Sequence, residues 1–233
     1  STVDRIDYSN DTPTASPKGP LTVEKKSRGA TGNSSYGYWA GGHPGSITTT
    51  DRLDYSSDTD TAVTKGPLSA GRYYLSATGS ASYGWFAGGG YPAVSTVDRI
   101  DYSSDTSTAS ARGHLEVAKY GTGAASGQAN ALPTSPTYAT RSATQINGTP
   151  YGWTASGYYS NVNERSWTNR IDYSNDTATA SPRGYTSSAR YGAAGTGNLS
   201  YGYVGGGKGP SAKSTVDRLD YSNDTPTMTA KGP

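Results

Sequence analysis

Residues 51–59 read Asp-Arg-Leu-Asp-Tyr-Ser-Ser-Asp-Thr, and this stretch decides the fold because it returns along the whole chain. Close copies begin at Asp4, Asp98 and Asp217, and a variant begins at Asn169. The central tyrosines of the five copies are spaced by 47, 47, 71 and 48 residues. Self-similarity at a fixed period of roughly 20–50 residues is typical of solenoids, propellers and other repeat arrays.

Two further strings alternate with the first. A Ser/Pro-Tyr-Gly string begins at Ser35, Ser82, Pro150 and Ser200. In three of these four copies an aromatic pair or Trp-Thr follows the glycine. A Lys/Arg-Gly pair recurs at Lys18, Lys65, Arg112, Arg183 and Lys231. The three strings together define one repeat of about 47 residues.

Each repeat contains four short strand candidates. The stretch from Thr2 to Tyr8 alternates, with Ile6 and Tyr8 on one face and Val3 and Arg5 on the other. Ser-Asn-Asp-Thr predicts a hairpin turn, and Thr-Ala-Thr-Ala-Ser predicts the return strand. The stretch that ends in Thr-Gly and the Tyr-Gly string supply the third and fourth strands. Four short strands per repeat indicate an all-β propeller with four-stranded blades, and a β-solenoid is the alternative.

The repeats organise residues 1–233 as a single tandem-repeat domain of four periods plus a partial fifth. Residues 1–20 match residues 214–233 at nearly every position, so there are five Asp-Tyr strings but four Tyr-Gly strings. Either the chain belongs to a longer array, or another chain completes the ring, or a four-bladed ring carries a leftover hairpin. We favour the longer array. The long interval predicts an insertion at about 121–142, rich in Gly, Ala, Ser, Thr and Pro.

Composition excludes several classes of site. The sequence has no cysteine, so disulfides, thiolate catalysis and cysteine metal sites are absent. The 20 basic and 18 acidic residues are interspersed, which gives no electrostatic support for a nucleic-acid groove. No apolar run is long enough for a membrane span. The glycine strings lack the Lys-Ser/Thr of a phosphate loop. We therefore expect no cofactor, no nucleic-acid partner and no membrane insertion.

Repeated carboxylates offer the strongest candidate metal site. The spacing Asp-x-Ser-x-Asp resembles the opening of a calcium loop, but the glycine and the bidentate glutamate of that loop are missing. The favoured interpretation is a turn in which Ser and Asp side chains bond backbone amides. The calcium candidates are Asp7, Ser9, Asp11, Asp54, Ser56 and Asp58. The recurring Arg5/Asp7 pair, like Arg52/Asp54, predicts a structural ladder that links neighbouring blades.

Aromatic residues provide candidate core and candidate binding positions. Trp39, Trp85 and Trp153 lie in the Tyr-Gly strings, which favours core packing over sugar stacking. Trp167 lies outside this register, within a variable 157–168 loop. Loops carry most partner contacts in rigid scaffolds. The predicted partner-binding residues are Trp167, Tyr158, Tyr159 and Tyr138.

Catalytic constellations are not evident. His43 and His114 are the two histidines and occupy different repeat positions, so neither has the partners of a triad or a zinc site. A hydrolase would need a unique carboxylate pair, for which Glu164 and Glu116 are the irregular candidates. A carboxylate present in every repeat is better explained as structural. We expect a protein that is not an enzyme.

The order of these elements resembles the kelch repeat. The resemblance rests on the glycine pair that ends residues 36–42, the Asp-Tyr strand of residues 46–55, the polar turn at 56–59 and Arg72. The kelch tryptophan after the polar turn is missing here. The sequence of residues 172–184 resembles the repeats of proteins from marine bacteriophages, cyanophages among them. In those proteins such arrays are associated with tails and virions. This resemblance covers nearly the whole chain outside about 121–140.

The resemblance implies a structural or binding module of a phage virion, a tail or fibre component that presents loops on a rigid propeller. Its expected location is the virion, outside the cell, and its expected partners are other virion or assembly proteins in an oligomer. The alternative is a secreted carbohydrate-binding propeller, whose ligand would be a host-surface glycan.

Overall fold

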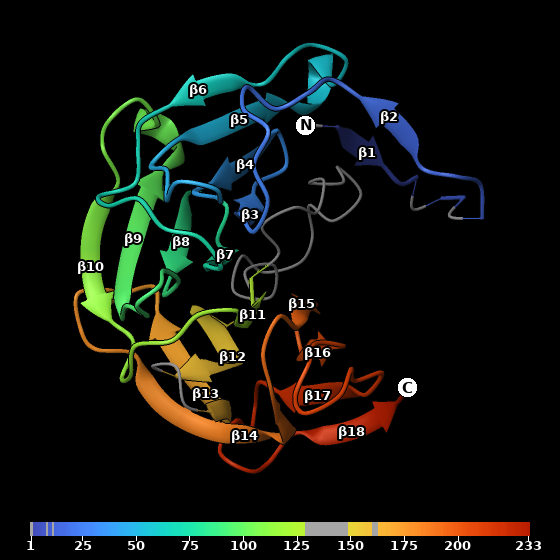
Figure 1. The fold of residues 1–233 in the computed structure, drawn as a ribbon, viewed down its shortest axis with the longest axis vertical. Helices are drawn as coiled ribbons and strands as arrows, with labels where there is room; N and C mark the ends of the chain where they lie inside the picture. The colour runs from blue at the N-terminus through green and yellow to red at the C-terminus, as the bar shows by residue number, and fades with distance from the viewer. Residues whose placement is uncertain (1, 8, 11, 129–148, 160–162) are drawn as a thin grey trace, which may run out of the picture.

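The computed structural model describes residues 2–7, 9–10, 12–128, 149–159 and 163–233. Antiparallel strands dominate the described residues, and the helical content is two short 3-10 turns, η1 (Tyr55–Ser57) and η2 (Tyr102–Ser104). The strands form four four-stranded sheets and one two-stranded sheet. Figure 1 shows the four larger sheets arranged around a common axis. The chain is a four-bladed β-propeller. The repeat period predicts the propeller and its four-stranded blades, and the solenoid alternative is wrong.

The first two blades are built from consecutive strands. The strands of blade 1 are β3 (Gly29–Gly32), β4 (Tyr36–Ala40), β5 (Thr50–Asp54) and β6 (Val63–Lys65). The strands of blade 2 are β7 (Ser76–Gly79), β8 (Tyr83–Ala87), β9 (Thr96–Asp101) and β10 (Ser110–His114).

The remaining strands follow the same plan. The strands of blade 3 are β11 (Gly123–Ser126), β12 (Tyr151–Tyr159), β13 (Asn163–Asp172) and β14 (Ser181–Arg190). The strands of blade 4 are β15 (Ala194–Gly197), β16 (Tyr201–Gly205), β17 (Val216–Asp220) and β18 (Thr229–Gly232). The two-stranded sheet is the N-terminal hairpin of β1 (Val3–Arg5) and β2 (Ser16–Lys18).

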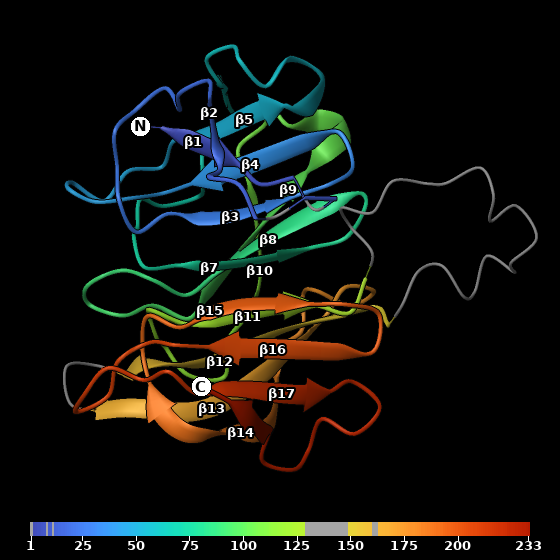
Figure 2. The ribbon, with the colours of Figure 1, turned by 90° about the vertical axis from the view of Figure 1, so that its right-hand side faces the viewer.

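Each blade is an antiparallel meander whose first strand is innermost. Strands β3, β7, β11 and β15 lie nearest the middle of the molecule, and consecutive members of this series contact one another (Figure 1). The side view in Figure 2 shows β15, β16 and β17 following one another outward within blade 4. The N-terminal hairpin lies beside blade 1, on the side of the ring that faces the C-terminal blade (Figure 1).

The hydrophobic core is divided among the interfaces between blades. One cluster joins blades 1 and 2 and includes Tyr38, Phe86 and Tyr102. A second joins blades 2 and 3 around Trp85 and Ile171, and a third joins blades 3 and 4 around Trp153, Val204 and Leu219. Tyrosine and tryptophan rings supply much of this buried surface because their polar tips can find partners while the rings pack.

Three strand predictions need correction. The return strand begins at the end of the Thr-Ala-Thr-Ala-Ser stretch and continues through the Lys/Arg-Gly pair, as β14 shows. The turn before it is longer than expected, and it contains the last Asp of the string, which pairs with cations of the neighbouring blade. The strand ending in Thr-Gly spans four residues, since the preceding cation is buried outside the ladder. Within the predicted 121–142 insertion, Gly123–Ser126 form β11, so any insertion starts after Ser126.

Candidate functional site

The three repeated strings meet at one joint between blades. At the joint of blades 1 and 2, the carboxylate of Asp105 accepts a hydrogen bond of 2.8 Å from the Tyr38 hydroxyl and one of 2.8 Å from Arg52 Nη1. Lys65 Nζ lies 3.3 Å from its other oxygen. Asp105 belongs to blade 2 and is 6% exposed, whereas its three partners come from blade 1. One buried carboxylate thus gathers a phenol and two cations from the neighbouring blade.

The same joint recurs twice more. Asp176 accepts hydrogen bonds from Trp85 Nε1 at 2.8 Å and Arg99 Nη1 at 3.0 Å, with Arg112 at 3.7 Å. Asp224 accepts from Trp153 Nε1 at 2.8 Å and Arg170 Nη1 at 3.2 Å, with Arg183 at 3.2 Å. The predicted ladder between blades is present, but its carboxylate is the last Asp of the string, which follows the tyrosine, and not the Asp that directly precedes the tyrosine, as in the predicted Arg52/Asp54 pair.

Aromatic stacking accompanies each carboxylate. Tyr102 stacks on Tyr38 with ring centroids 4.7 Å apart, Tyr173 on Trp85 at 4.0 Å, and Tyr221 on Trp153 at 4.2 Å. Trp85 and Trp153 are buried as predicted, at 1% exposed each. Trp39 is half-buried, because in blade 1 Tyr38 occupies the position that Trp85 fills in blade 2.

The calcium candidates are engaged within the protein. Asp54 Oδ1 accepts hydrogen bonds from the Ser56 amide and hydroxyl, which lower its pKa, and Asp7 accepts the same pair from Ser9. Asp58 pairs with Arg5 at 2.7 Å and with Lys18 at 3.3 Å. Asp11 lies outside the described residues. The described side chains of this set therefore build a turn and a joint between blades.

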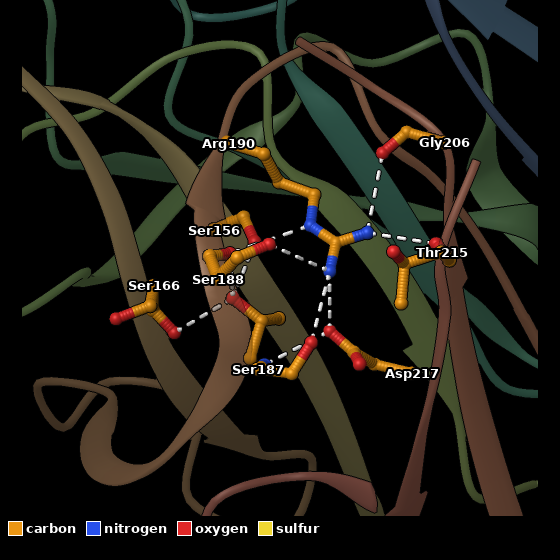
Figure 3. Close-up of polar contacts among 9 residues, drawn as sticks. Ser156, Ser166, Ser187, Ser188, Arg190, Gly206, Thr215 and Asp217 are labelled. Atoms are coloured by element: carbon orange, nitrogen blue, oxygen red, sulfur yellow. Dashed lines mark hydrogen bonds and ion pairs between the residues drawn. The ribbon is translucent and has the colours of Figure 1, made fainter. Parts of the chain in front are cut away.

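A second ionic pair is buried at blades 1, 2 and 4, between an aspartate in the third strand of the blade and an arginine that precedes its first strand. The arginine of blade 4 is Arg190, the last residue of β14. Arg190 is fully buried, and its Nη2 lies 2.6 Å from Asp217 Oδ2 (Figure 3). Its Nη1 donates to the carbonyl oxygens of Thr215 and Gly206, at 2.8 and 3.3 Å. The corresponding pairs are Arg28–Asp51 at 2.7 Å and Arg72–Asp98 at 3.1 Å. Repetition and complete burial indicate a structural role for these pairs.

Blade 3 departs from this pattern. Lys119 stands where blades 2 and 4 have Arg72 and Arg190, and Asn169 stands where they have aspartates. Lys119 is 1% exposed and its Nζ donates to the carbonyl oxygen of Trp167 at 3.4 Å. Burial lowers the pKa of the Lys119 ammonium to about 7. The alignment of the repeats shows that Lys119 and Asn169 replace an Arg and an Asp, but the burial that lowers the pKa is evident only from the structure.

One face of the propeller carries a continuous group of tyrosines, which we term the tyrosine cluster. Its members come from blades 2, 3 and 4: Tyr73, Tyr74, Tyr91, Tyr120, Tyr158 and Tyr191. Neighbouring rings within the cluster have centroids 5.2 to 6.3 Å apart. His43 of blade 1 extends the group at 4.8 Å from Tyr73.

Repetition and exposure distinguish the tyrosine cluster from the core. Tyr73, Tyr120 and Tyr191 each directly follow the buried cation of their blade. Tyr91 is 61% exposed and Tyr74 is 44% exposed, so their ring faces and hydroxyls are open to a partner. Burial and the neighbouring phenols raise the pKa of Tyr120, which keeps its hydroxyl protonated. The cluster can offer flat apolar rings together with hydrogen-bond donors and acceptors.

Of the four partner-binding residues predicted from the sequence, Tyr158 belongs to the tyrosine cluster. Its ring lies 5.5 Å from that of Tyr120. Tyr159 and Trp167 both contact Arg165, whose guanidinium lies 5.4 and 4.9 Å from their rings. Residues 157–159 and 163–168 belong to strands β12 and β13, so the predicted 157–168 loop is largely a strand pair. Tyr138 lies outside the described residues.

The irregular residues considered for catalysis lie apart. His43 packs on Tyr73, whereas His114 is exposed at the end of β10. Glu116 accepts a hydrogen bond of 3.3 Å from Asn169 Nδ2, and Glu164 is paired with Tyr158 across β12 and β13. Among the described residues, no group of three or more His, Asp or Glu side chains is placed to hold a metal ion.

Two hollows repeat at corresponding places in different blades. One of about 230 Å³ lies under the β9–β10 hairpin, next to Asp101 and Thr108, and one of about 190 Å³ lies under the β17–β18 hairpin, next to Asp220 and Thr227. Because the linings correspond residue by residue, we interpret the hollows as features of the repeat and not as a unique active site.

Comparison with known proteins gives no family assignment. No family model matches the chain, and no curated protein matches it. In the described part of the chain, no helix is long and apolar enough to cross a membrane.

Proposed function

We propose that the protein is a non-catalytic binding module, a rigid propeller that holds the tyrosine cluster against a protein partner in a larger assembly. The observation that carries this proposal is the cluster itself. Tyrosine is enriched at protein interfaces because it buries a large, rigid ring and keeps a hydrogen-bonding tip. The repeated carboxylate joints supply the rigid support that such a surface needs.

The class of assembly rests on the resemblance of residues 172–184 to repeat proteins of marine phages. On that basis we propose a tail, fibre or other virion component, which acts outside the cell as part of an oligomer. The partners would be other virion or assembly proteins.

A second candidate function is carbohydrate binding, for example to a host-surface glycan. The exposed rings of Tyr74 and Tyr91 favour this candidate, since the apolar faces of sugar rings pack on aromatic planes. Both candidates use the same surface, so they are distinguished by the chemistry of the ligand and not by its location.

A glycan array and a particle structure separate the two. The array would use the natural chain, the Tyr74→Ser/Tyr91→Ser double variant and a Tyr185→Ser control, because Tyr185 is 48% exposed and lies outside the cluster. Glycan binding that is lost only in the double variant would favour the carbohydrate candidate.

Cryo-electron microscopy of the native particle tests the leading proposal. We expect a polypeptide packed over the tyrosine cluster and no retained glycan on the array. An assembled particle in which the cluster faces open solvent, together with a silent array, would contradict both functions.

A further inference from the structure

The N-terminal hairpin has the geometry of the outer half of a blade. Strands β1 and β2 pair Val3 with Lys18 and Arg5 with Ser16. Strands β5 and β6 of blade 1 pair Thr50 with Lys65 and Arg52 with Val63, which is the same register one repeat later. The hairpin therefore corresponds to the third and fourth strands of a blade.

The hairpin also docks as an outer half-blade does. Arg5 and Lys18 bind Asp58 of blade 1 at 2.7 and 3.3 Å, as Arg52 and Lys65 bind Asp105. The Gly19 amide donates to the Asp58 carbonyl oxygen at 2.8 Å. The equivalent bond from Gly66 to Asp105 is 2.7 Å long. The joint on this side of blade 1 is thus built from the same parts as the others.

What the hairpin lacks are the two inner strands. Its sheet has two strands within the described part of the chain, and no described strand pairs with the other edge of β1. At the complete joints the carboxylate has a third partner, which lies in the second strand of the preceding blade. These partners are Tyr38, Trp85 and Trp153. A two-stranded sheet has no such position to offer Asp58.

Two side chains of the hairpin are exposed where the corresponding side chains of a complete blade are covered by its inner strands. Ile6 is 57% exposed, whereas the four residues at its repeat position are 3 to 4% exposed: Leu53, Ile100, Ile171 and Leu219. The Arg5 side chain is 59% exposed, whereas that of Arg52 is 23% exposed. Arg52 lies under the ring of Tyr36 at 4.3 Å, and Tyr36 comes from an inner strand.

The innermost strand of blade 4 is open in the same region. All four residues of β15 are exposed, whereas β3, β7 and β11 each contain buried residues. In Figure 1, β15 and the hairpin border the open side of the ring, between blade 4 and blade 1. An inner strand added to the hairpin would enter this opening.

We propose that the edge of β1 binds a β-hairpin that carries a fifth copy of the Tyr-Gly-aromatic sequence, and that this hairpin completes a fifth blade. The four copies in the chain already form the inner strands of blades 1 to 4, so the occupant is an additional polypeptide segment of the same repeat type. The inference is independent of the ligand assigned to the tyrosine cluster.

The register of the bound segment follows from the complete blades. Trp85 lies opposite Arg99, and Gly84 lies opposite Ile100. By correspondence, the aromatic residue of the occupant lies opposite Arg5 and its glycine opposite Ile6. Its phenol or indole donates to Asp58, and main-chain hydrogen bonds extend the sheet as in other cases of strand addition.

A peptide of residues 27–42 tests the proposal, because it contains the natural sequence of β3 and β4. Hydrogen exchange of the full chain with and without the peptide is the measurement. We expect saturable one-to-one binding and new protection confined to residues 2–7 and to the turn that contains Asp58. A peptide with Tyr38→Phe, which cannot donate to Asp58, should bind at least threefold more weakly.

Variants of the protein sharpen the test. Ile6→Asp leaves the free protein folded, since Ile6 is exposed, and should abolish binding. Asp58→Asn should weaken binding at least tenfold, whereas Asp105→Asn, the same change at a complete joint, should leave it unchanged.

Several results would overturn the proposal. These are no protection of β1, equal protection by a peptide of scrambled sequence, or faster exchange of residues 27–42 of the chain, which would show that the peptide displaces β3 and β4 from their pairing with β5. Protection of β1 in a dimer without peptide would show that a second copy is the occupant.

Discussion

At the scale of single residues, the last Asp of each string organises the contacts between blades. Asp105, Asp176 and Asp224 each satisfy two cations and one aromatic donor from the preceding blade. Burial of a carboxylate is costly unless it is paired and hydrogen-bonded, so such a group tolerates few alternative geometries. This explains why an Asp recurs in the polar turn of every repeat, although its cationic partners lie in another blade.

Substitution of this residue should be strongly destabilising. In Asp105→Asn, Arg52 and Lys65 lose their counter-charge while remaining largely buried. Breaking a buried ion pair by removing one partner costs about 3 kcal/mol. We expect a loss of about that size in the free energy of unfolding, measured by urea denaturation. Asp54→Asn is the control, because Asp54 bonds only its own turn through Ser56 and should cost far less. Equal losses would contradict the assigned role of Asp105.

In four of the five Lys/Arg-Gly pairs, the glycine is required by the close approach of a neighbouring backbone. A Cβ at Gly113 would lie 1.7 Å from the carbonyl oxygen of Ala178 in the next blade. Because backbone cannot yield as a side chain can, Gly113→Ala should destabilise the protein by about 3 kcal/mol or more. Thermal unfolding measures the effect. Gly205→Ala is the matched control, since its Cβ would meet only Val216 Cγ2 at 3.3 Å. A Gly113→Ala protein with an unchanged Tm would show that the joint is looser than described.

At the scale of elements, blade 3 differs from the other blades in having Lys119 and Asn169 in place of a buried Arg–Asp pair. The same position therefore carries a paired ion in three blades and an unpaired buried amine in one. Burial lowers the pKa of the Lys119 amine to about 7, so its protonation changes near neutrality.

This difference predicts a dependence of stability on pH. Between about pH 7 and 10.5, the unfolded chain keeps a proton on Lys119 that the folded chain releases. Stability should therefore rise with pH, by about 2 kcal/mol between pH 7.5 and 9. Urea denaturation across that window measures the slope, and Lys119→Met should remove it. Asn169→Asp, which restores a neighbouring carboxylate, should also flatten the slope. An unchanged slope in Lys119→Met would assign the dependence to another group.

The sequence predicts the fold better than it predicts the sites. Four strands per repeat, the Tyr-Gly strand and the contact between blades follow from alternation and period alone. The partner of Arg52 does not, because Asp54 is two residues away in sequence and Asp105 is in another blade. The sequence also does not predict the tyrosine cluster, apart from its member Tyr158. Three of its members, Tyr73, Tyr120 and Tyr191, follow buried cations at corresponding positions, but only the assembled blades bring the rings together.

At the scale of the whole molecule, the propeller is a series of blades in which each contacts its neighbours through one joint. Contacts between innermost strands run from β3 to β7, from β7 to β11 and from β11 to β15. Repeat proteins of this kind have stabilities that approximate a sum of blade and interface terms. The position of a damaged joint along the series should then decide how much of the molecule it loosens.

Hydrogen exchange of two matched variants measures this effect. Asp58→Asn weakens the terminal joint that holds the hairpin, so increased exchange should be confined to residues 2–20 and to the turn that contains Asp58. Asp176→Asn weakens the joint of blades 2 and 3, where Trp85, Arg99 and Arg112 converge. Its effect should extend into both blades, and proteins with local opening units show such patterns. If both variants exchanged faster throughout, the blades would unfold as one cooperative unit, and stability would not divide among the joints.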